Sequence, residues 1–355
     1  MSNRAEYSKN LIFLSENNIK KHVLPQYNLQ NSQVEQIKLK DTDKQRAVYK
    51  VTSNDNTYCL KKVYYSIEEL LFVYSAIEWL YHHDINVPRI LSTKNHGRYV
   101  IYENMLFILT PWIQGDKCDF NSPYEIILCA NTLGKLHGFS KNFKPILGSC
   151  EKCGFSNLNK TLNKHFYNLL IYSNLAYKYK DTFSKLYLED FKINISLAKI
   201  SNSISYSIKD TNLSKSLCHN DYVSKNLILD KNNNIWVIDF DKCRIDYCAF
   251  DISYCLRRML RKEKIKWSLP LAITFLDEYE KYNILTLDDY KYILSYLSFP
   301  QKYWKISRDY YSNIYKCNKK AFVSIFKKSS LYNKEQLNFV REFQRYIEYK
   351  FSVKL

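Results

Sequence analysis

The chain has 355 residues, of which 46% are hydrophobic and 16% are aromatic. Disordered proteins are poor in hydrophobic residues, so this composition excludes disorder for most of the chain and allows either one two-lobed domain or two modest ones. The formal net charge of +18 favours an anionic ligand or partner. The basic residues are spread along the sequence without the dense block that nucleic-acid-binding proteins show, so we do not expect nucleic-acid binding.

The sequence shows neither a secretory signal nor an apolar run long enough to span a membrane. We therefore expect synthesis in a reducing cytoplasm, no membrane partner, and cysteines that remain mostly thiols. Cys150 and Cys153 form a lone C-x-x-C pair. Without a second pair or a neighbouring histidine, this spacing is weak evidence for zinc or redox chemistry.

The first part of the chain predicts a short helical extension followed by a sheet. Residues 10–30 are expected to form a helix and a loop that ends near Pro25. Apolar runs separated by polar turns then predict three strands. These strands cover residues 34–39, 47–52 and 57–63.

A single helix is predicted next. Ser66 and Glu69 have the spacing of a capping box, and apolar residues continue with helical period behind them. Two more strands are then expected over residues 98–103 and 106–112. This part of the chain therefore predicts a small sheet that carries one crossing helix.

The rest of the chain has a mostly helical pattern. Helical periodicity covers residues 124–137 and 160–209, a strand–turn–strand follows at residues 227–238, and helices are expected after Asp251. The expected fold class is α+β, with a small β-rich N-lobe and a larger, mostly helical C-lobe whose shared cleft would bind a ligand. The expected boundaries are 1–32 for an N-terminal helical extension, 33–113 for the N-lobe and 114–355 for the C-lobe.

The strongest chemical signal is the segment His219-Asn-Asp221-Tyr-Val-Ser-Lys-Asn226, followed thirteen residues later by Asp239. A carboxylate such as Asp221 can receive the proton of a hydroxyl that attacks a phosphate. Asn226 and Asp239 offer a carbonyl and a carboxylate oxygen, which are ligands that Mg²⁺ prefers. The hairpin predicted between them would return Asp239 to the side of Asn226. The alternative is a polar hairpin whose acids are incidental.

This segment resembles the catalytic loop and the metal-binding aspartate of the protein-kinase-like superfamily. Asp246 and Asp251 resemble the tail that follows this segment in aminoglycoside and choline phosphotransferases. The resemblance implies that ATP and Mg²⁺ are the cofactors and that a hydroxyl is the phosphate acceptor. The implied roles are catalytic base for Asp221, brace of the loop for His219, metal ligand for Asn226 and Asp239, and structural acid for Asp251.

Lys61, near the end of the third predicted strand, resembles the strand lysine of kinases. Such a lysine bridges the α- and β-phosphates as a point charge. Glu69 is the candidate for its acidic partner, although the capping box explains Glu69 without a catalytic role. The resemblance also implies nucleotide contacts at Thr110 and Trp112, where a hinge would meet the adenine. The alternative for Lys61 is a solvated lysine at the edge of a sheet.

One part of the kinase pattern is absent from the sequence. Kinases cover the phosphates with a Gly-rich loop, whose backbone approaches closely because glycine has no side chain. The corresponding turn, residues 41–46, contains no glycine, and Asp41 and Asp43 would repel phosphate. Either Lys44 or Arg46 compensates, or nucleotide binding is weak.

Several segments also resemble the spore-coat family typified by the CotS protein of endospore-forming bacteria. The resemblance extends from about residue 20 to about residue 345. It implies a location in the spore coat, with other coat proteins as partners, but it identifies no acceptor. The segments are Ala47–Val51, Leu60–Lys62, Glu69–Phe72, Leu109–Gly115, Leu133–His137, Asp239–Asp241, Leu256–Arg258 and Phe299–Trp304.

Two further features have ordinary explanations. His137 ends an amphipathic helix and is expected to be a packed core residue, not a ligand. A basic run follows Asp251; such a run is most often a solvated face, and the alternative is that it faces an anionic acceptor. The basic run consists of Arg257, Arg258, Arg261, Lys262, Lys264 and Lys266.

Two functions remain open from the sequence alone. The first is an ATP- and Mg²⁺-dependent phosphotransferase that acts on a hydroxyl of a small molecule or coat component. The second is a spore-coat scaffold with a kinase fold and no turnover, which the glycine-free turn and the uncertain partner of Lys61 favour. The presence of Asp221, Asn226 and Asp239 favours the first, because a scaffold has no physical need for metal ligands.

Overall fold

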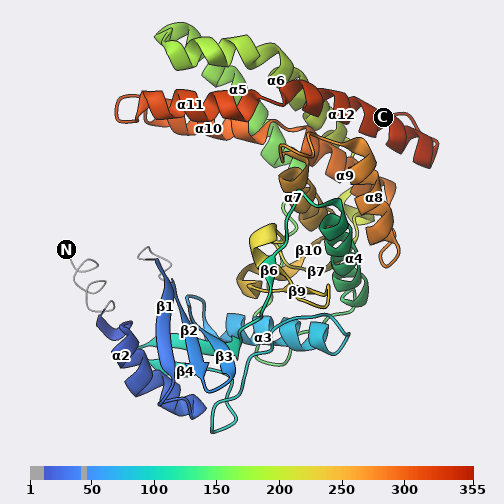
Figure 1. Cartoon of the computed structure of the whole chain (residues 1–355). Coiled ribbons are helices and arrows are strands. Elements are labelled where there is room, and N and C mark those ends of the chain that lie inside the picture. The colour runs from blue at the N-terminus through green and yellow to red at the C-terminus, as the bar shows by residue number, and fades with distance from the viewer. Residues whose placement is uncertain (1–11, 41–45) are drawn as a thin grey trace. The chain divides into compact units, whose positions relative to one another are not determined.

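The computed structural model describes residues 12–40 and 46–355 and divides the chain into two compact units (Figure 1). Residues 226–241, which the sequence analysis assigned to the C-lobe, belong to the same unit as the predicted N-lobe. Most of the turn over residues 41–46 lies outside the described residues. Unit 1 consists of Met1–Lys117, Phe143–Lys152 and Asn226–Asp241, and unit 2 consists of Cys118–Asn142, Cys153–Lys225 and Lys242–Leu355.

The N-terminal extension packs on the sheet of unit 1. Leu14, Ile19 and Val23 are fully buried in one cluster with sheet residues. The Tyr49 hydroxyl donates a hydrogen bond to the Leu14 carbonyl oxygen at 2.6 Å, so the extension belongs to the core of this unit. It is made of α2 (Glu16–Asn18), a π-helical turn η1 (Ile19–Val23) and a 3-10 turn η2 (Leu24–Tyr27).

The main sheet of unit 1 is antiparallel, with the strand order β1-β2-β3-β5-β4. Side chains alternate along β2, where Ala47, Tyr49 and Val51 are buried, as expected for a strand with one face on the core. A bulge between Gln36 and Lys38 interrupts the pairing of β1 with β2. The five predicted strands are confirmed as β1 (Gln33–Lys40), β2 (Arg46–Ser53), β3 (Asn56–Val63), β4 (Val100–Tyr102) and β5 (Met105–Pro111).

The predicted crossing helix is α3 (Ile67–Tyr81). Its first turn is fixed by a capping box: Ser66 Oγ accepts a hydrogen bond from the Glu69 N–H, and Glu69 Oε2 accepts one from the Ser66 N–H. Leu70 and Leu80 are buried on the face that helical periodicity predicts. The helix prediction is therefore confirmed together with its start.

A second small sheet completes unit 1, in the order β6 (Asp116–Lys117), β8 (Leu227–Leu229) and β9 (Ile235–Val237). The hairpin of β8 and β9 is the one predicted from the sequence. Gly115 precedes β6 with a φ of 149°, and a Cβ at this position would lie 2.2 Å from the Leu229 carbonyl oxygen. Only glycine permits this approach of the two main chains.

Unit 2 is mostly helical, as predicted. A short antiparallel pair of strands, β7 (Lys215–Cys218) and β10 (Arg244–Tyr247), lies within it. Stacked aromatic side chains fill part of its core; the rings of Phe183 and Tyr310 are 3.8 Å apart between centroids. The helices are α4 (Pro123–Phe139), α5 (Leu158–Tyr179), α6 (Thr182–Tyr206), α7 (Cys248–Leu260), α8 (Leu269–Glu280), α9 (Leu287–Ser298), α10 (Gln301–Ser312), α11 (Lys319–Ser330) and α12 (Asn333–Phe351).

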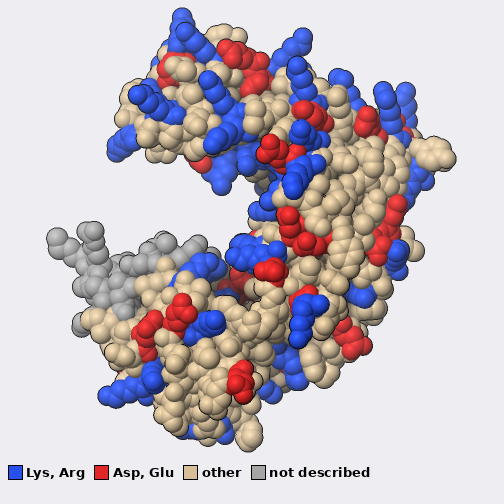
Figure 2. Space-filling model, in the orientation of Figure 1, with Lys and Arg blue, Asp and Glu red and all other residues tan. Residues whose placement is uncertain are grey.

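The antiparallel sheet with one crossing helix and the helical unit confirm the predicted α+β class. Basic side chains lie over the visible faces of both units, as their even distribution along the sequence predicts (Figure 2). In the part of the chain that the structure describes, no helix combines the length and the apolar character needed to cross a membrane.

Candidate functional site

Lys61 lies on β3 of unit 1 and forms two ion pairs. Its Nζ is 2.6 Å from Asp239 Oδ1 and 2.6 Å from Asp241 Oδ1. The Asp241 side chain is only 4% exposed. Burial favours the neutral amine, but the charges of Asp241 and Asp239 outweigh it and raise the pKa of Lys61 above its ordinary value. Unit 1 therefore holds a fixed cation beside two carboxylates.

Asp241 is surrounded by further donors. The Tyr65 hydroxyl donates to Oδ1 at 3.4 Å, and Arg46 Nη1 lies 3.8 Å from Oδ2. Lys152 Nζ donates to the main-chain oxygen of Asp241 at 3.1 Å. Oδ2 is nevertheless buried without a hydrogen-bond partner among the described residues. This oxygen thus has lone pairs available for an added cation or donor.

Asp239 and Asn226 lie at the two ends of the β8–β9 hairpin. The Ile238 N–H donates to the Asn226 carbonyl oxygen at 3.0 Å, so the hairpin returns Asp239 to the neighbourhood of Asn226. Asp239 has a φ of 67°, in the left-handed region, which aspartate adopts at a modest cost. Asp239 follows the end of β9 after one intervening residue, and its side chain is one of the two carboxylates that pair with Lys61.

The oxygen donors at this end of the hairpin fit a magnesium ion. Asp239 offers a carboxylate and Asn226, which is 4% exposed, offers an amide oxygen. The buried Asp241 Oδ2, without a hydrogen-bond partner among the described residues, adds an oxygen that a cation would satisfy. Mg²⁺ takes ligands of these kinds in proteins.

The other residues predicted to contact nucleotide are placed differently. Glu69 is engaged in the capping box of α3, and among the described residues the carboxylate partners of Lys61 are Asp239 and Asp241. Thr110 lies on β5 opposite Cys59 of β3. The Trp112 N–H donates to the Thr57 carbonyl oxygen at 3.0 Å, which continues the pairing of these strands.

Asp221 lies in unit 2, in the loop after β7, with its side chain 8% exposed. Lys225 Nζ is 3.1 Å and Lys242 Nζ is 3.4 Å from Oδ2, and the Tyr254 hydroxyl donates to Oδ1 at 3.3 Å. Burial opposes ionisation, but the hydrogen bond from Lys225 and the charge of Lys242 outweigh it and lower the pKa of Asp221 below its ordinary value. The carboxylate is therefore ionised at neutral pH.

Asp251, in the first turn of α7, holds the loop that carries Asp221. Its Oδ2 accepts a hydrogen bond from the His219 N–H at 2.6 Å, and its Oδ1 accepts one from the Asn220 N–H at 2.8 Å. His219 Nδ1 in turn accepts a hydrogen bond from the Asp221 N–H at 3.2 Å. Asn220 has a φ of 59°, so the loop turns sharply between these contacts.

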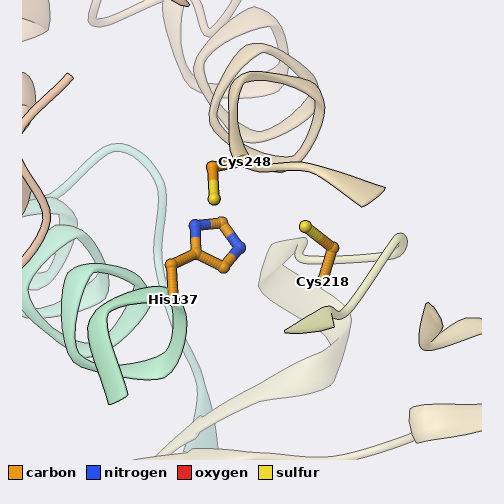
Figure 3. Close-up of side chains that lie close together, drawn as sticks. All are labelled: His137, Cys218 and Cys248. Atoms are coloured by element: carbon orange, nitrogen blue, oxygen red, sulfur yellow. The ribbon is translucent and has the colours of Figure 1, made fainter. Parts of the chain in front are cut away.

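His137 lies near the end of α4 in unit 2 and is fully buried, as predicted for a core residue. Its Nε2 is 3.4 Å from Asp251 Oδ2 and its Nδ1 is 2.8 Å from the Tyr279 hydroxyl. The thiols of Cys218 and Cys248 lie beside its ring (Figure 3). Burial favours the neutral thiol, but the hydrogen bond from Cys218 and the field of His137 lower the pKa of Cys248 to about 6.

Comparison with known proteins places the chain in a family. A model of the phosphotransferase enzyme family matches residues 41–290, which is more than half of the sequence. The chain belongs to this phosphotransferase family. The superfamily inferred from the segment around Asp221 is thereby confirmed.

Solved structures show which fold this phosphotransferase-family chain has. An aminoglycoside phosphotransferase from Alicyclobacillus acidocaldarius subsp. acidocaldarius DSM 446 has a TM-score of 0.77 at 17% identity, over 92% of this chain and 96% of that one. A spectinomycin phosphotransferase in complex with ADP and spectinomycin has a TM-score of 0.60 at 17% identity, over 92% and 96%. An amicoumacin kinase in complex with AMP-PNP and Ca²⁺ has a TM-score of 0.60 at 14% identity, over 94% and 96%. These likenesses confirm the protein-kinase-like fold.

Sequence reasoning missed several residues around the predicted site of this phosphotransferase-family chain. The sequence analysis named Asp241 only within the segment Asp239–Asp241 that resembles the spore-coat family. Its spacing of two residues from Asp239 was a signal that both carboxylates can reach one cation. Lys225 and Lys242 were not connected with Asp221; the spacing of four residues was a signal for Lys225. For Lys242, on the far side of the hairpin, the sequence offered no signal.

Proposed function

We propose that the chain is an ATP- and Mg²⁺-dependent phosphotransferase that acts on a hydroxyl of a small molecule or coat component. The observation that carries this proposal is Lys61 Nζ, held 2.6 Å from both Asp239 and Asp241 in unit 1. Kinase-type phosphotransfer uses such a lysine for the phosphates and such an aspartate for the metal ion. Binding of ADP by a spectinomycin phosphotransferase and of AMP-PNP by an amicoumacin kinase supports the choice of a nucleotide.

In this proposal, Asp221 orients the acceptor hydroxyl and receives its proton. The carboxylate is suited to this role because Lys225 and Lys242 keep it ionised, and because His219 and Asp251 fix the loop around it. A neutral carboxylic acid in the same place would have no free lone pair of sufficient basicity to accept the proton.

Lys61 binds the phosphates, and the main chain near Thr110 and Trp112 contacts the base. Asp239 and Asn226 would hold Mg²⁺, which would supply positive charge that offsets the charge of the phosphates. Because transfer depends on positioning and electrostatics, these side chains need no covalent chemistry of their own.

Thermal unfolding with and without ATP and Mg²⁺ tests the proposal. A ligand that binds only the folded chain stabilises it by about 2.7 kcal/mol at a hundredfold excess over Kd, so the midpoint should rise by several degrees. Asp239→Ala should abolish the Mg²⁺-dependent part of this rise. Asp55→Ala, in the exposed turn between β2 and β3, is the matched control and should retain it. The absence of any rise at saturating ATP would refute nucleotide binding.

The finer proposal is that the phosphotransferase is a CotS-type protein, made in the cytoplasm and deposited in the spore coat with other coat proteins as partners. It rests on the sequence resemblance to that family. A fluorescent fusion expressed in a sporulating host should gather at the spore surface, and uniform fluorescence in the mother cell would refute it.

The glycine-free turn and the capping-box role of Glu69 favour the second candidate, a coat scaffold without turnover. The two candidates predict different outcomes of the thermal measurement. A scaffold would reach the spore surface without any response to ATP and Mg²⁺, whereas a phosphotransferase would show both properties.

A further inference from the structure

Four basic side chains of unit 2 line a cavity of about 110 Å³, which lies where the ends of α7, α10, α11 and α12 meet. Arg257 and Arg261 at the end of α7, Lys302 of α10 and Lys328 of α11 line it. None of the described residues that line it is acidic. Since roughly 10–15 Å³ already holds one water, there is room for a group of several non-hydrogen atoms.

The basic run after Asp251 was expected to be a solvated face, but Arg257 is only 9% exposed. Its guanidinium lies over the Tyr296 ring and its Nη2 donates to the Tyr296 main-chain oxygen, so the side chain has a fixed position. The prediction that the basic run is a solvated face is therefore wrong for Arg257, because this residue lies on the side of α7 that packs against the other helices.

Within the described part of the chain, the four cations around the cavity have no counter-ion. No carboxylate of the described residues forms an ion pair with Arg257, Arg261, Lys302 or Lys328. Burial, together with the charge of Arg257, lowers the pKa of Arg261 to about 10. Partial desolvation of the Lys302 ammonium group, together with the charges of Arg261 and Arg258, lowers the pKa of this otherwise exposed lysine. Like charges held together in this way would be stabilised by a bound anion.

Three of the residues that line the cavity each carry a polar atom that is buried without a hydrogen-bond partner among the described residues: Arg257 Nε, Asn333 Nδ2 and Asn194 Oδ1. Two of them are donors and one is an acceptor. Buried polar atoms are rarely left unpaired, because their desolvation is then uncompensated. Water alone could pair with these atoms, but it would leave the four positive charges without an anion.

Two helices also begin at this cavity without a side-chain cap. Pro300 precedes α10 and Tyr332 precedes α12, and neither side chain accepts a hydrogen bond from the first turn. Free N–H groups at the start of a helix attract anions, because they carry the positive end of the helix dipole. This effect adds to the buried Arg257 and the two unpaired donors, Arg257 Nε and Asn333 Nδ2, all of which favour an anionic ligand.

We propose that this cavity is a binding site for the phosphate group of a hydroxylated small molecule, such as a sugar or polyol phosphate. The phosphate accepts hydrogen bonds from Arg257 Nε and Asn333 Nδ2, and a ligand hydroxyl donates to Asn194 Oδ1. The exposed lysines Lys302 and Lys328 lie where the ligand enters. The inference goes beyond phosphotransfer, since a chain without turnover would bind the same ligand.

Calorimetric titration of the full chain with glucose 6-phosphate tests this site, with glycerol 3-phosphate and inorganic phosphate as smaller probes and glucose as the uncharged control. Saturable binding of glucose 6-phosphate and no binding of glucose are expected. Lys302→Glu combined with Lys328→Glu should weaken binding about tenfold or more, because charge-assisted contacts are lost and like charge is introduced. Lys305→Glu combined with Lys327→Glu, on the same helices but outside the lining, should change affinity less than about twofold.

Two outcomes would overturn the proposal: failure of all three phosphate probes to bind, or an equal loss of affinity in both pairs of variants. Both pairs alter exposed lysines, so the comparison does not depend on whether an Arg257 variant folds. Lys61→Met separates this site from the nucleotide site. Binding of glucose 6-phosphate should survive this change, and its loss would assign the binding to unit 1 instead.

Discussion

Asp251→Asn removes the charge that holds the loop carrying Asp221. The native carboxylate accepts two main-chain hydrogen bonds, from His219 at 2.6 Å and from Asn220 at 2.8 Å, and is fully buried. An asparagine keeps one carbonyl oxygen and presents an N–H₂ group to the second donor. The variant loses one hydrogen bond to a charged group, which contributes about 1.5–3 kcal/mol. It also leaves one buried N–H group unpaired, which costs about 1–3 kcal/mol. The two costs partly describe the same loss, so they do not add in full.

We therefore expect Asp251→Asn to lower the free energy of unfolding by about 2–4 kcal/mol. Hydrogen exchange read by mass spectrometry should show faster exchange in peptides that cover His219 to Asp221, and thermal unfolding should show a lower midpoint. The main-chain N–H groups of the loop should lose their protection from hydrogen exchange at temperatures well below that midpoint, because both hydrogen bonds that hold the loop are accepted by this one side chain.

Asp289→Asn is the matched control in the same unit. Asp289 is also fully buried and accepts main-chain hydrogen bonds from Ser214 and Thr286, at 3.0 Å each. This variant should also unfold at a lower temperature, but exchange in the loop at His219 should remain slow. Unchanged exchange at His219 in Asp251→Asn, or equal acceleration in both variants, would refute the idea that Asp251 holds the loop.

Three further changes have expected outcomes. Lys61→Met should strengthen binding of Mg²⁺ alone, since two carboxylates lose their cation, and weaken binding of ATP with Mg²⁺; calorimetry measures both. Lys242→Met should raise the pKa of Asp221 toward its ordinary value. A carboxyl group whose pKa is lower in the folded than in the unfolded chain stabilises the folded state fully only above its unfolded-state pKa. The loss of stability in this variant should therefore be present near pH 7 and should shrink as pH falls below about 4. Thermal unfolding measured across this pH range tests the expectation. Gly134→Ala should destabilise by about 1–2 kcal/mol in chemical unfolding, because a Cβ 2.6 Å from the Tyr279 carbonyl oxygen forces α4 and α8 apart at a cost greater than the gain in helix propensity.

The controls for these changes are exposed positions of the same residue type. Lys20→Met and Lys199→Met should leave Mg²⁺ affinity and the pH dependence of stability unchanged. Gly97→Ala should be nearly neutral, because residue 97 is exposed and its added Cβ meets mainly Thr93 Oγ1 at 3.2 Å, a contact that a small shift of this side chain relieves. Weaker Mg²⁺ binding in Lys61→Met, a pH-independent loss in Lys242→Met, or a stable Gly134→Ala would each contradict the reasoning behind that variant.

Local patterns predicted the elements well because short-range rules determine them. The capping box at Ser66 and Glu69 and the β8–β9 hairpin depend on residues close in sequence, and both are present in the structure. The contact of Asp251 with His219 spans 32 residues and depends on how α7 packs against β7. No periodicity encodes such a contact, so the sequence identified Asp251 only through family resemblance.

The site was predictable to a similar extent. Lys61 and Asp239 were singled out by type and position, but their direct pairing results from the packing of β3 against the end of the hairpin. Glu69 illustrates the limit: two roles were compatible with its position, and the structure shows it in the helix cap. The cavity beside Arg257 was beyond prediction, because it depends on how the end of α7 packs against the ends of α10, α11 and α12, which begin some forty residues or more after it along the chain.

The main chain passes from one unit to the other five times, after Lys117, Asn142, Lys152, Lys225 and Asp241. No contiguous piece of the gene therefore encodes either unit. A fragment that ended at Lys117 would lack the partner strand of β6 and both carboxylates that pair with Lys61. A single crossover between two relatives would consequently combine strands of one parent with partner strands of the other. We therefore expect this protein to be inherited and engineered as one piece.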